Sequence, residues 1–320
     1  MTGRTRPRAE RDGRVPVVKS PYHEGEQAVQ RRAREGHPGW GSPMFDGVIP
    51  AGFVPFLLRQ RMLVVGAVDR DGAVWASALT GPAGFAEPVG PSTLAVAAAP
   101  APADPLHGVF AQRHDIGVLA LEPQTVRRIR VNGTARQQDD GLVVRTEQVL
   151  GNCPKYLQRR LPVADAPPRT PRVVASGTGL GADQRRLVEE ADTFFIASHA
   201  PGHGADASHR GGQPGFVTAA GPRRLVWPDY VGNSFYMTLG NLQLDPACGL
   251  LFWDWDRGSF LHLTGRARVD WDEHHRAGVP GALRMVEFDV ERFVQVDDAT
   301  ALRWEFAAAS PVNPPAPLRS

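Results

Sequence analysis

Two adjacent side chains, His209 and Arg210, form a pair that could do chemistry. They lie in the stretch ASHRGGQPGF, which runs from Ala207 to Phe216. An arginine guanidinium donates hydrogen bonds in a planar fork that fits phosphate or carboxylate oxygens, and an imidazole can bind an anion or carry a proton. The glycines behind the pair allow a tight turn. The stretch therefore predicts an anion-binding strand that ends in a glycine turn.

The segment after this turn predicts a helix whose start adds to the site. Asn233 is a candidate N-cap, the helix is expected from about Ser234 to Leu244, and Pro246 ends it. A helix start offers free backbone N–H groups and the positive end of the helix dipole to a phosphate. We expect ligand contacts in this half from Ser208, His209, Arg210, Trp227, Asp229, Tyr230, Asn233, Ser234, Thr238 and Asn241.

The stretch that carries His209 and Arg210 has a near copy earlier in the chain. ASALTGPAGF (76–85) lies 131 residues before ASHRGGQPGF, and GPSTL (90–94) lies 131 residues before GPRRL. Further on, GVLAL (117–121) precedes GLLFW by 132 residues. So constant an offset predicts an internal duplication. The first copy has Ala78 and Leu79 where the second has His209 and Arg210.

Each copy consists mostly of short runs rich in β-branched and aromatic residues between glycine, proline and aspartate, which predict strands. One helix is expected in each copy, and Asp104 with Pro105 would start the first one. The pattern predicts a mainly β fold of two tandem six-stranded split β-barrels that pack as an intrachain pseudo-dimer. The expected divisions are a disordered basic arm (1–20), an N-terminal barrel (21–160), a linker (161–183), a C-terminal barrel (184–310) and a proline-rich tail (311–320).

The composition excludes several classes of protein. A net charge of +2 gives no reason to expect a nucleic-acid partner, and two cysteines cannot form a disulfide framework. The basic N-terminus has no apolar segment behind it, and no run is long and apolar enough for a membrane helix. We therefore expect a cytoplasmic protein without a membrane partner.

Two other motifs have simpler interpretations. SGTGLGADQRR (176–186) looks like a dinucleotide-binding loop, but it precedes a barrel strand, so we favour a helix start capped near Gly181 or Asp183. Histidines 199, 203, 274 and 275 lack the cysteine or carboxylate spacing of a metal site, so we expect turn histidines and no metal.

The blocks ADASHRGGQPGF, TLGNLQLDP and GLLFWDWDRGSFLHLTGRARV resemble the FMN-binding split-barrel family related to pyridoxamine 5'-phosphate oxidase. The first half resembles the same type of domain, and the resemblance covers roughly residues 20–305. It implies FMN held between two barrels, with the phosphate at one strand and the neighbouring helix start. The family has a Ser-Arg-Lys run at that helix start, where this chain has Tyr236, Met237 and Thr238.

The two copies lack complementary parts. Only the first copy has GNCPKYLQRR (151–160), in which Asn152, Lys155, Tyr156 and Arg159 are expected at the start of a terminal helix. Our hypothesis is one composite cofactor site, with Asn152, Lys155 and the arginines 127, 128 and 130 reaching across to the second copy. The alternative is that this motif only starts a helix and buries Cys153.

The resemblance implies an FMN-dependent oxidoreductase that acts on a small molecule, with oxygen as a candidate electron acceptor. Tyr230, His209 and Lys155 are the candidate catalytic residues. The alternative function is a non-catalytic protein that binds flavin, haem or the deazaflavin F420. Both a monomeric pseudo-dimer and a homodimer fit the sequence.

Overall fold

The computed structural model describes residues 20–36, 46–151 and 153–315. The first half contains helical segments at its start and seven strands of the main sheet. The bounds are α1 Glu24–Ala33, η2 Ala51–Phe53, α2 Val54–Leu58, β1 Met62–Val68, β2 Val74–Thr80, β3 Ala86–Gly90, β4 Thr93–Val96, η3 Val109–Ala111, β5 His114–Glu122, β6 Arg127–Gln138 and β7 Gly141–Gly151.

The second half repeats this arrangement and adds strands at its ends. The bounds are β8 Arg159–Pro162, β9 Arg172–Gly177, α3 Ala182–Glu190, β10 Thr193–Ala200, β11 Gly204–Gly211, β12 Thr218–Gly221, β13 Arg224–Asp229, α4 Met237–Leu244, β14 Ala247–Asp254, β15 Ser259–Asp270, α5 Glu273–Arg276, β16 Arg284–Asp297 and β17 Trp304–Ala308.

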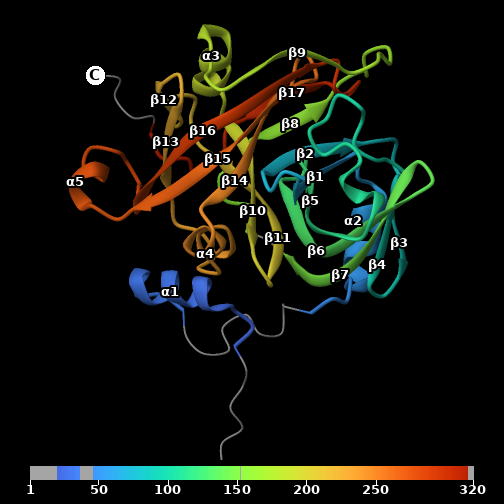
Figure 1. The fold of residues 1–320 in the computed structure, drawn as a ribbon, viewed down its shortest axis with the longest axis horizontal. Coiled ribbons are helices and arrows are strands. Elements are labelled where there is room, and N and C mark those ends of the chain that lie inside the picture. The colour runs from blue at the N-terminus through green and yellow to red at the C-terminus, as the bar shows by residue number, and fades with distance from the viewer. Residues whose placement is uncertain (1–19, 37–45, 152, 316–320) are drawn as a thin grey trace, which may run out of the picture.

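The two large sheets have the same strand order. The first runs β2-β1-β5-β6-β7-β4-β3, and the second runs β11-β10-β14-β15-β16-β13-β12 (Figure 1). Every neighbouring pair in both is antiparallel. The mainly β fold of two tandem units is therefore confirmed. Each unit has a seventh strand that the sequence did not indicate, because β3 and β12 are short and carry few β-branched residues.

Three apolar cores hold the sheets. One lies within the first sheet, one within the second, and a third lies between them. Because side chains alternate across a strand, β10 puts Phe194 and Ile196 into its own sheet's core and Phe195 and Ala197 into the core between sheets. This burial on both faces explains why β1 and β10 read as continuous apolar runs. The two units pack as the predicted pseudo-dimer.

The two sheets approach each other most closely at corresponding glycines. A Cβ atom on Gly117 would lie 2.4 Å from the backbone carbon of Asp206, and a Cβ atom on Gly249 would lie 2.5 Å from the Cα atom of Trp75. Gly117 and Gly249 correspond in the two copies, as do Trp75 and Asp206. The contacts are therefore the two halves of one pseudo-twofold arrangement.

Some local predictions were wrong. The first half has a short 3-10 turn, η3, in place of the expected helix, although Leu106 and Phe110 are buried there. The segment after β7 forms no terminal helix; it leads through a turn into β8. The expected linker contains strand β9, which pairs with β16, and the end of β8, which pairs with β17.

The predicted helix start near Gly181 is confirmed, because α3 begins at Ala182.

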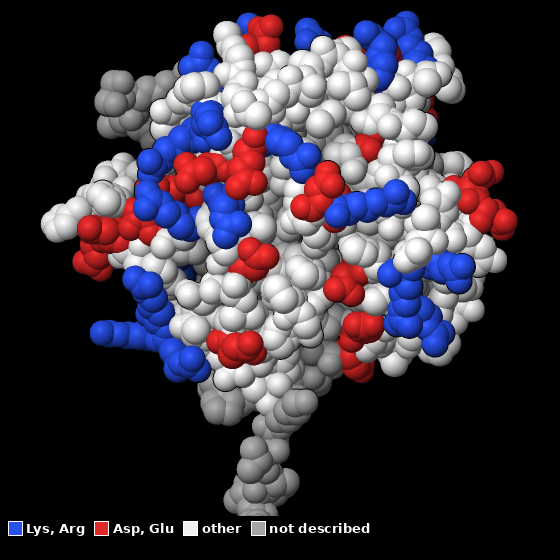
Figure 2. Space-filling model, viewed as in Figure 1, with Lys and Arg blue, Asp and Glu red and all other residues white. Residues whose placement is uncertain are grey.

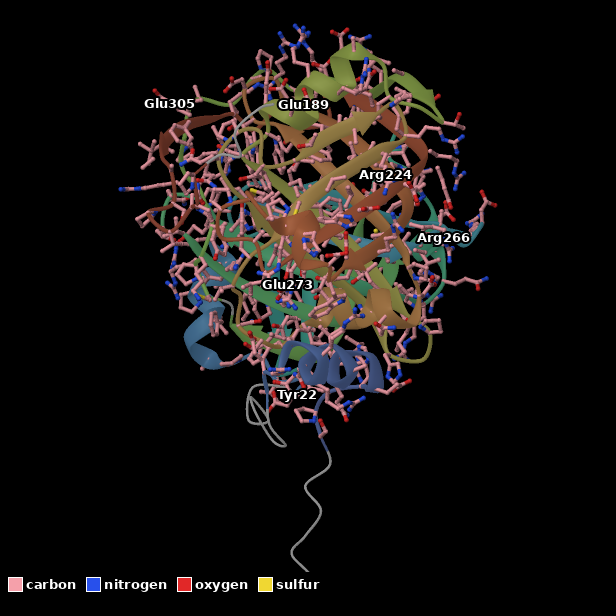
Figure 3. The ribbon with its side chains drawn as sticks, turned by 90° about the vertical axis from the view of Figure 1, so that its left-hand side faces the viewer. Tyr22, Glu189, Arg224, Arg266, Glu273 and Glu305 are labelled. Carbon is pink, nitrogen blue, oxygen red and sulfur yellow. The ribbon has the colours of Figure 1, made fainter. Side chains whose placement is uncertain are left out.

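Helix α1 belongs to the first half in sequence but packs on α4 of the second half (Figure 3, where Tyr22 marks its start). Gly25 and Gly240 allow this, since a Cβ atom on Gly25 would lie 2.2 Å from the Gly240 carbonyl oxygen. The start of the expected N-terminal barrel (21–160) thus lies against the second half. Residues 1–19 of the basic arm and residues 316–320 of the tail lie outside the described residues.

On the face of Figure 2, acidic and basic side chains are interspersed. No helix in the described part of the chain is long and apolar enough to cross a membrane.

Replacement of Gly117 by alanine is expected to destabilise the protein by about 1–3 kcal/mol, because the new methyl group meets backbone atoms that cannot rotate away. Urea unfolding measures this. Gly52→Ala is the matched control, since a Cβ atom at Gly52 meets nothing within 4 Å. Equal stability of the two variants would contradict the close approach of the sheets.

Glu26 gives the stability a pH dependence. Burial raises the pKa of its carboxyl from 4.5 to about 8, with a further contribution from Asp206. The native state therefore holds a proton that the unfolded chain releases, so this contribution to stability is complete below pH 4.5 and decreases as the pH rises to about 8.

Glu26→Gln removes this titration and keeps a side-chain acceptor for the His23 N–H at the start of α1. We expect the variant to gain stability relative to the parent protein between pH 5 and 8, as measured by thermal unfolding at each pH. A stability difference that does not change with pH would rule out a buried, protonated Glu26.

Candidate functional site

One pocket gathers side chains from both halves of the chain. Strand β6 contributes Arg128 and Arg130, the segment after β7 contributes Lys155, and β11 contributes His209 and Arg210. Other lining residues are Tyr156, Asp229, Tyr230, Asn233, Ser234 and Thr238. We call this the composite pocket. It encloses about 110 Å³.

The start of helix α4 lines this pocket, but three residues later than predicted. Ser234 and Tyr236 adopt left-handed backbone conformations, with φ of 61° and 58°, so helical geometry begins only at Met237. The Asn233 side chain accepts a hydrogen bond from the Phe235 N–H (3.2 Å), so it caps a turn and not the helix. Met237 and Thr238, the first two residues of the helix, still line the pocket.

Cations dominate the composite pocket. Arginines 128, 130 and 210 and Lys155 line it together with a single carboxylate, Asp229. Burial, together with the neighbouring arginines 130 and 210, lowers the pKa of Arg128 to about 9. Burial also lowers the pKa of Arg210, although Asp229 opposes this. The pocket therefore has a surplus of positive charge that an anion would relieve.

His209 is uncharged in this setting. Burial lowers the pKa of its imidazole well below the ordinary 6.5, and arginines 128, 210 and 160 add to the effect. Its side chain is 5% exposed, and its Nε2 atom is buried without a hydrogen-bond partner in the described part of the protein. A buried nitrogen without a partner at a pocket wall marks a place for a ligand group or a water.

A buried network behind the pocket joins the two halves. Arg130 Nε lies 3.3 Å from Asp206 Oδ1, and Arg130 Nη2 donates to the Ser208 hydroxyl. Asp206 also accepts hydrogen bonds from Asn132 (3.2 Å), Ser208 (2.8 Å) and Thr238 (3.3 Å). Asp206 thus fixes Arg130 and the second-half strand in one geometry.

Two tyrosines from different halves pack against each other at the pocket wall, with their rings tilted. The rings of Tyr156 and Tyr230 have centroids 5.1 Å apart, and the Tyr156 hydroxyl donates to the Val231 carbonyl (3.1 Å). Burial raises the pKa of Tyr230 to about 12, so its hydroxyl keeps its proton at neutral pH. Burial raises the pKa of Asp229, whose Oδ2 atom lies 3.0 Å from Arg284 Nε.

The structure leaves three predicted binding residues outside the lining. Trp227 is 1% exposed and packs in the second core between Phe194 and Phe288. Asn241 bonds to His23 and Ser198, so it supports α1. Ser208 lies behind the pocket in the Asp206 network. Asn152 lies outside the described residues.

The sequence interpretation missed the supporting residues Asp206, Arg284 and Glu35. Glu35 accepts hydrogen bonds from the hydroxyls of Ser234 (2.5 Å) and Tyr236 (2.8 Å), and it follows α1 in the chain. Asp206 could have been found, because it precedes Ser208 by two residues and two-residue spacing puts both on one face of a strand. Nothing in the sequence links Glu35 or Arg284 to residues so far away.

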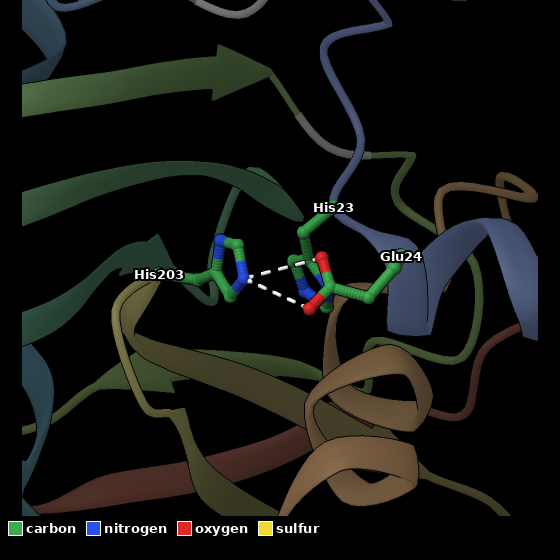
Figure 4. Close-up of side chains that lie close together, drawn as sticks. All are labelled: His23, Glu24 and His203. Carbon is green, nitrogen blue, oxygen red and sulfur yellow. Dashed lines mark hydrogen bonds and ion pairs between the residues drawn. The ribbon is translucent and has the colours of Figure 1, made fainter.

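A cluster of His23, Glu24 and His203 lies where α1 meets the turn before β11 (Figure 4). His203 Nε2 lies 3.3 Å from a Glu24 oxygen, and the two imidazole rings stack with centroids 4.7 Å apart. Both ring nitrogens of His23 are already used, since Nδ1 accepts from the Gly25 N–H (3.1 Å) and Nε2 bonds to Asn241 (3.0 Å). The cluster fits helix docking better than metal binding.

A larger groove of about 1230 Å³ lies on the other side of Gln158 and Gly212. Its carboxylates outnumber its arginines, and Arg160 bonds Asp192 through both carboxylate oxygens (2.7 and 2.8 Å). Its charges are therefore largely paired, in contrast to those of the composite pocket.

The composite pocket fits one end of FMN. Forked guanidinium donors, an ammonium group and a helix start are the groups that bind a phosphate monoester. An enclosed volume of about 110 Å³ holds a phosphate but not a three-ring flavin, which would extend out of the enclosed part.

Replacement of Asp206 by asparagine is expected to destabilise the protein by about 3–5 kcal/mol, because Arg130 keeps its charge in a buried site without a counter-charge. Chemical denaturation measures the loss. Asp165→Asn is the control: Asp165 pairs with Arg61 at half-exposed side chains, and its loss is expected to cost under about 1 kcal/mol. Similar losses for both variants would show that the Arg130–Asp206 pair is not buried as described.

No protein-family model matches the chain. No curated protein matches it either. Among solved structures it is similar to the H111A variant of HupZ from Group A Streptococcus, with 11% identity over 36% of this chain and 98% of that chain, and a TM-score of 0.30. It is similar to an FMN-binding protein from Syntrophomonas wolfei, with 8% identity over 35% of this chain and 84% of that chain, and a TM-score of 0.28.

A third similar structure is a protein related to general stress protein 26, of the pyridoxinephosphate oxidase family, from Clostridium acetobutylicum. Identity is 10% over 39% of this chain and 92% of that chain, with a TM-score of 0.27. Each match spans little more than a third of this chain. Likeness this low concerns the fold alone and says nothing of function.

Proposed function

We propose that this chain binds one FMN between its two barrels and acts as an FMN-dependent oxidoreductase on a small molecule. The observation that supports this most directly is the surplus of cations in the composite pocket. Arg128 and Arg130 come from one half and Arg210 from the other, and only Asp229 among the lining residues opposes them. A phosphate group supplies the missing negative charge and accepts several hydrogen bonds at once.

The phosphate-binding residues are arginines 128 and 210, Lys155 and the start of α4. Arg128 is held in place by a hydrogen bond from Nη2 to the Cys153 carbonyl (2.5 Å), and Arg210 by one from Nη1 to the His209 carbonyl (3.0 Å). Both guanidinium groups retain further N–H donors for a ligand. Lys155 adds a mobile point charge at the same wall.

A bound flavin would supply the redox chemistry, and oxygen is a candidate final acceptor. The chain itself supplies His209, Tyr230 and Lys155. His209 stays neutral, so its unpartnered Nε2 nitrogen can form a hydrogen bond with a bound molecule. Tyr230 remains a hydrogen-bond donor up to about pH 12, and Lys155 orients an anionic group.

The single-site part of this proposal follows from the asymmetry of the halves. The positions that correspond to His209 and Arg210 hold Ala78 and Leu79. The positions that correspond to Arg128 and Arg130 hold Phe260 and His262. The place that corresponds to the composite pocket by the pseudo-symmetry thus lacks the charges that a phosphate requires, and one flavin per chain is expected.

The second candidate is a protein that holds flavin, haem or F420 without turnover. The visible absorption spectrum of the purified protein separates these ligands. Bleaching by a reductant and recovery in air would support turnover over storage.

Arg210→Leu is expected to weaken FMN binding at least about tenfold, because charge-assisted hydrogen bonds contribute about 1.5–3 kcal/mol. Equilibrium dialysis with the full chain measures the affinity and the number of flavins bound. Arg266→Leu is the matched control, since Arg266 is exposed on β15 outside the pocket (Figure 3). Equal affinities of the two variants would refute the phosphate site, and two flavins per chain would refute the single site.

A further inference from the structure

A second cavity lies at the place that corresponds to the composite pocket in the other half of the pseudo-dimer. It is lined by Ala78, Leu79 and Thr80 of β2, by Phe260 and His262 of β15, and by Asp104. Residues 78 and 79 correspond to 209 and 210, and residues 260 and 262 correspond to 128 and 130. We call it the neutral pocket. It encloses about 180 Å³.

The neutral pocket has lost the cations of its counterpart but has kept a polar atom without a partner. His262 is 0% exposed, and its Nδ1 atom lies 3.0 Å from the Ala76 carbonyl oxygen. Because a carbonyl oxygen only accepts, Nδ1 is the donor in this contact, and in a neutral imidazole Nε2 is then an acceptor. Nε2 is buried and has no hydrogen-bond partner in the described part of the chain.

The other polar group at this wall is also an acceptor. Asp104 Oδ1 accepts from the Leu106 N–H (2.8 Å), and its Oδ2 accepts from the Ser77 hydroxyl. Among the residues that the structure describes, no arginine or lysine lines the cavity. Thr80 accepts a hydrogen bond from the Thr300 hydroxyl (3.0 Å). A ligand that pairs with Nε2 of a neutral His262 must donate a hydrogen bond, and the Asp104 carboxylate disfavours an anion.

Size and lining restrict the ligand further. A dry apolar cavity of about 150 Å³ holds a benzene ring, so 180 Å³ accommodates a single ring with one substituent. Ala78, Leu79, Phe260 and Val296 supply apolar contacts. Ala98, Ala99 and Ala101 are only half-buried, so the cavity is open to solvent on that side.

We propose that the neutral pocket binds a small uncharged molecule, of the size of a single ring, that donates one hydrogen bond to His262 Nε2. The site would be occupied independently of the composite pocket, since the two cavities share no lining residue. The duplicated fold thus provides two ligand sites of opposite selectivity, one for an anion and one for a neutral donor.

Phenol and toluene are matched probes, because they have nearly the same shape and only phenol donates a hydrogen bond. Binding to the full chain is measured by isothermal titration calorimetry. His262→Asn keeps an N–H donor near the position of Nδ1 and removes Nε2. One hydrogen bond contributes about 0.5–1.5 kcal/mol, so phenol affinity is expected to fall about fivefold in this variant while toluene affinity stays within about twofold.

Ala78→Leu fills the cavity without touching His262 and is expected to abolish binding of both probes. Arg210→Leu alters only the composite pocket and is expected to leave phenol affinity unchanged. Benzoate is expected not to compete with phenol. Failure of phenol to bind, as when water alone occupies the cavity, would overturn the proposal, and so would phenol binding that survives both His262→Asn and Ala78→Leu.

Discussion

The close approach of the two sheets at Gly117 and Gly249 is the constraint on which the rest of the structure depends. Backbone meets backbone there without an intervening side chain, so β5 lies against β11 and β14 against β2. Gly66 and Ala197, which correspond in the two halves, also touch, because a Cβ atom on Gly66 would lie 2.5 Å from that of Ala197. Corresponding residues meet each other only near a twofold axis, so these contacts locate the pseudo-symmetry axis between the sheets. With the axis fixed, β6 of one half must face β11 of the other, and Arg130 reaches Ser208.

The same geometry produces two cavities, and the side chains at corresponding positions make them different. In one, arginines at positions 128, 130 and 210 gather around a single carboxylate. In the other, those positions hold Phe260, His262 and Leu79. A homodimer of identical barrels would have two identical sites. Duplication within one chain allows each site to change alone, and here one is rich in arginine while the other has no arginine or lysine among its described lining residues.

The sequence predicted the repeated architecture because the repeat itself carries strong signals. Glycine turns and strands that are apolar on both faces recur at a nearly constant offset. Each can be recognised from a short stretch of sequence, without knowledge of the tertiary structure. The composite site could be predicted in part, since Lys155 and Arg210 lie in motifs present in only one copy. The helix start could not, because the left-handed residues Ser234 and Tyr236 are held by Glu35, which lies about two hundred positions earlier in the chain. Trp227 was predicted to contact the ligand but lies in the second core. The sequence alone does not distinguish a buried aromatic residue from one that faces a ligand.

The composite pocket also shows how the protein tolerates buried charge. Asp206 neutralises Arg130 at the interface, and Arg284 lies against Asp229, so each of these charges has a partner of opposite sign. Arg128 and Arg210 have no carboxylate within ion-pair distance among the described residues, and burial lowers the pKa of both guanidinium groups. A buried guanidinium group without a counter-charge has a lowered pKa because its charged form is destabilised. A bound anion would stabilise that charged form, so the lowered pKa and the affinity for anions have the same cause. A bound anion would therefore raise the pKa of both arginines and stabilise the contact between the halves, which couples ligand binding to the interface that forms the site.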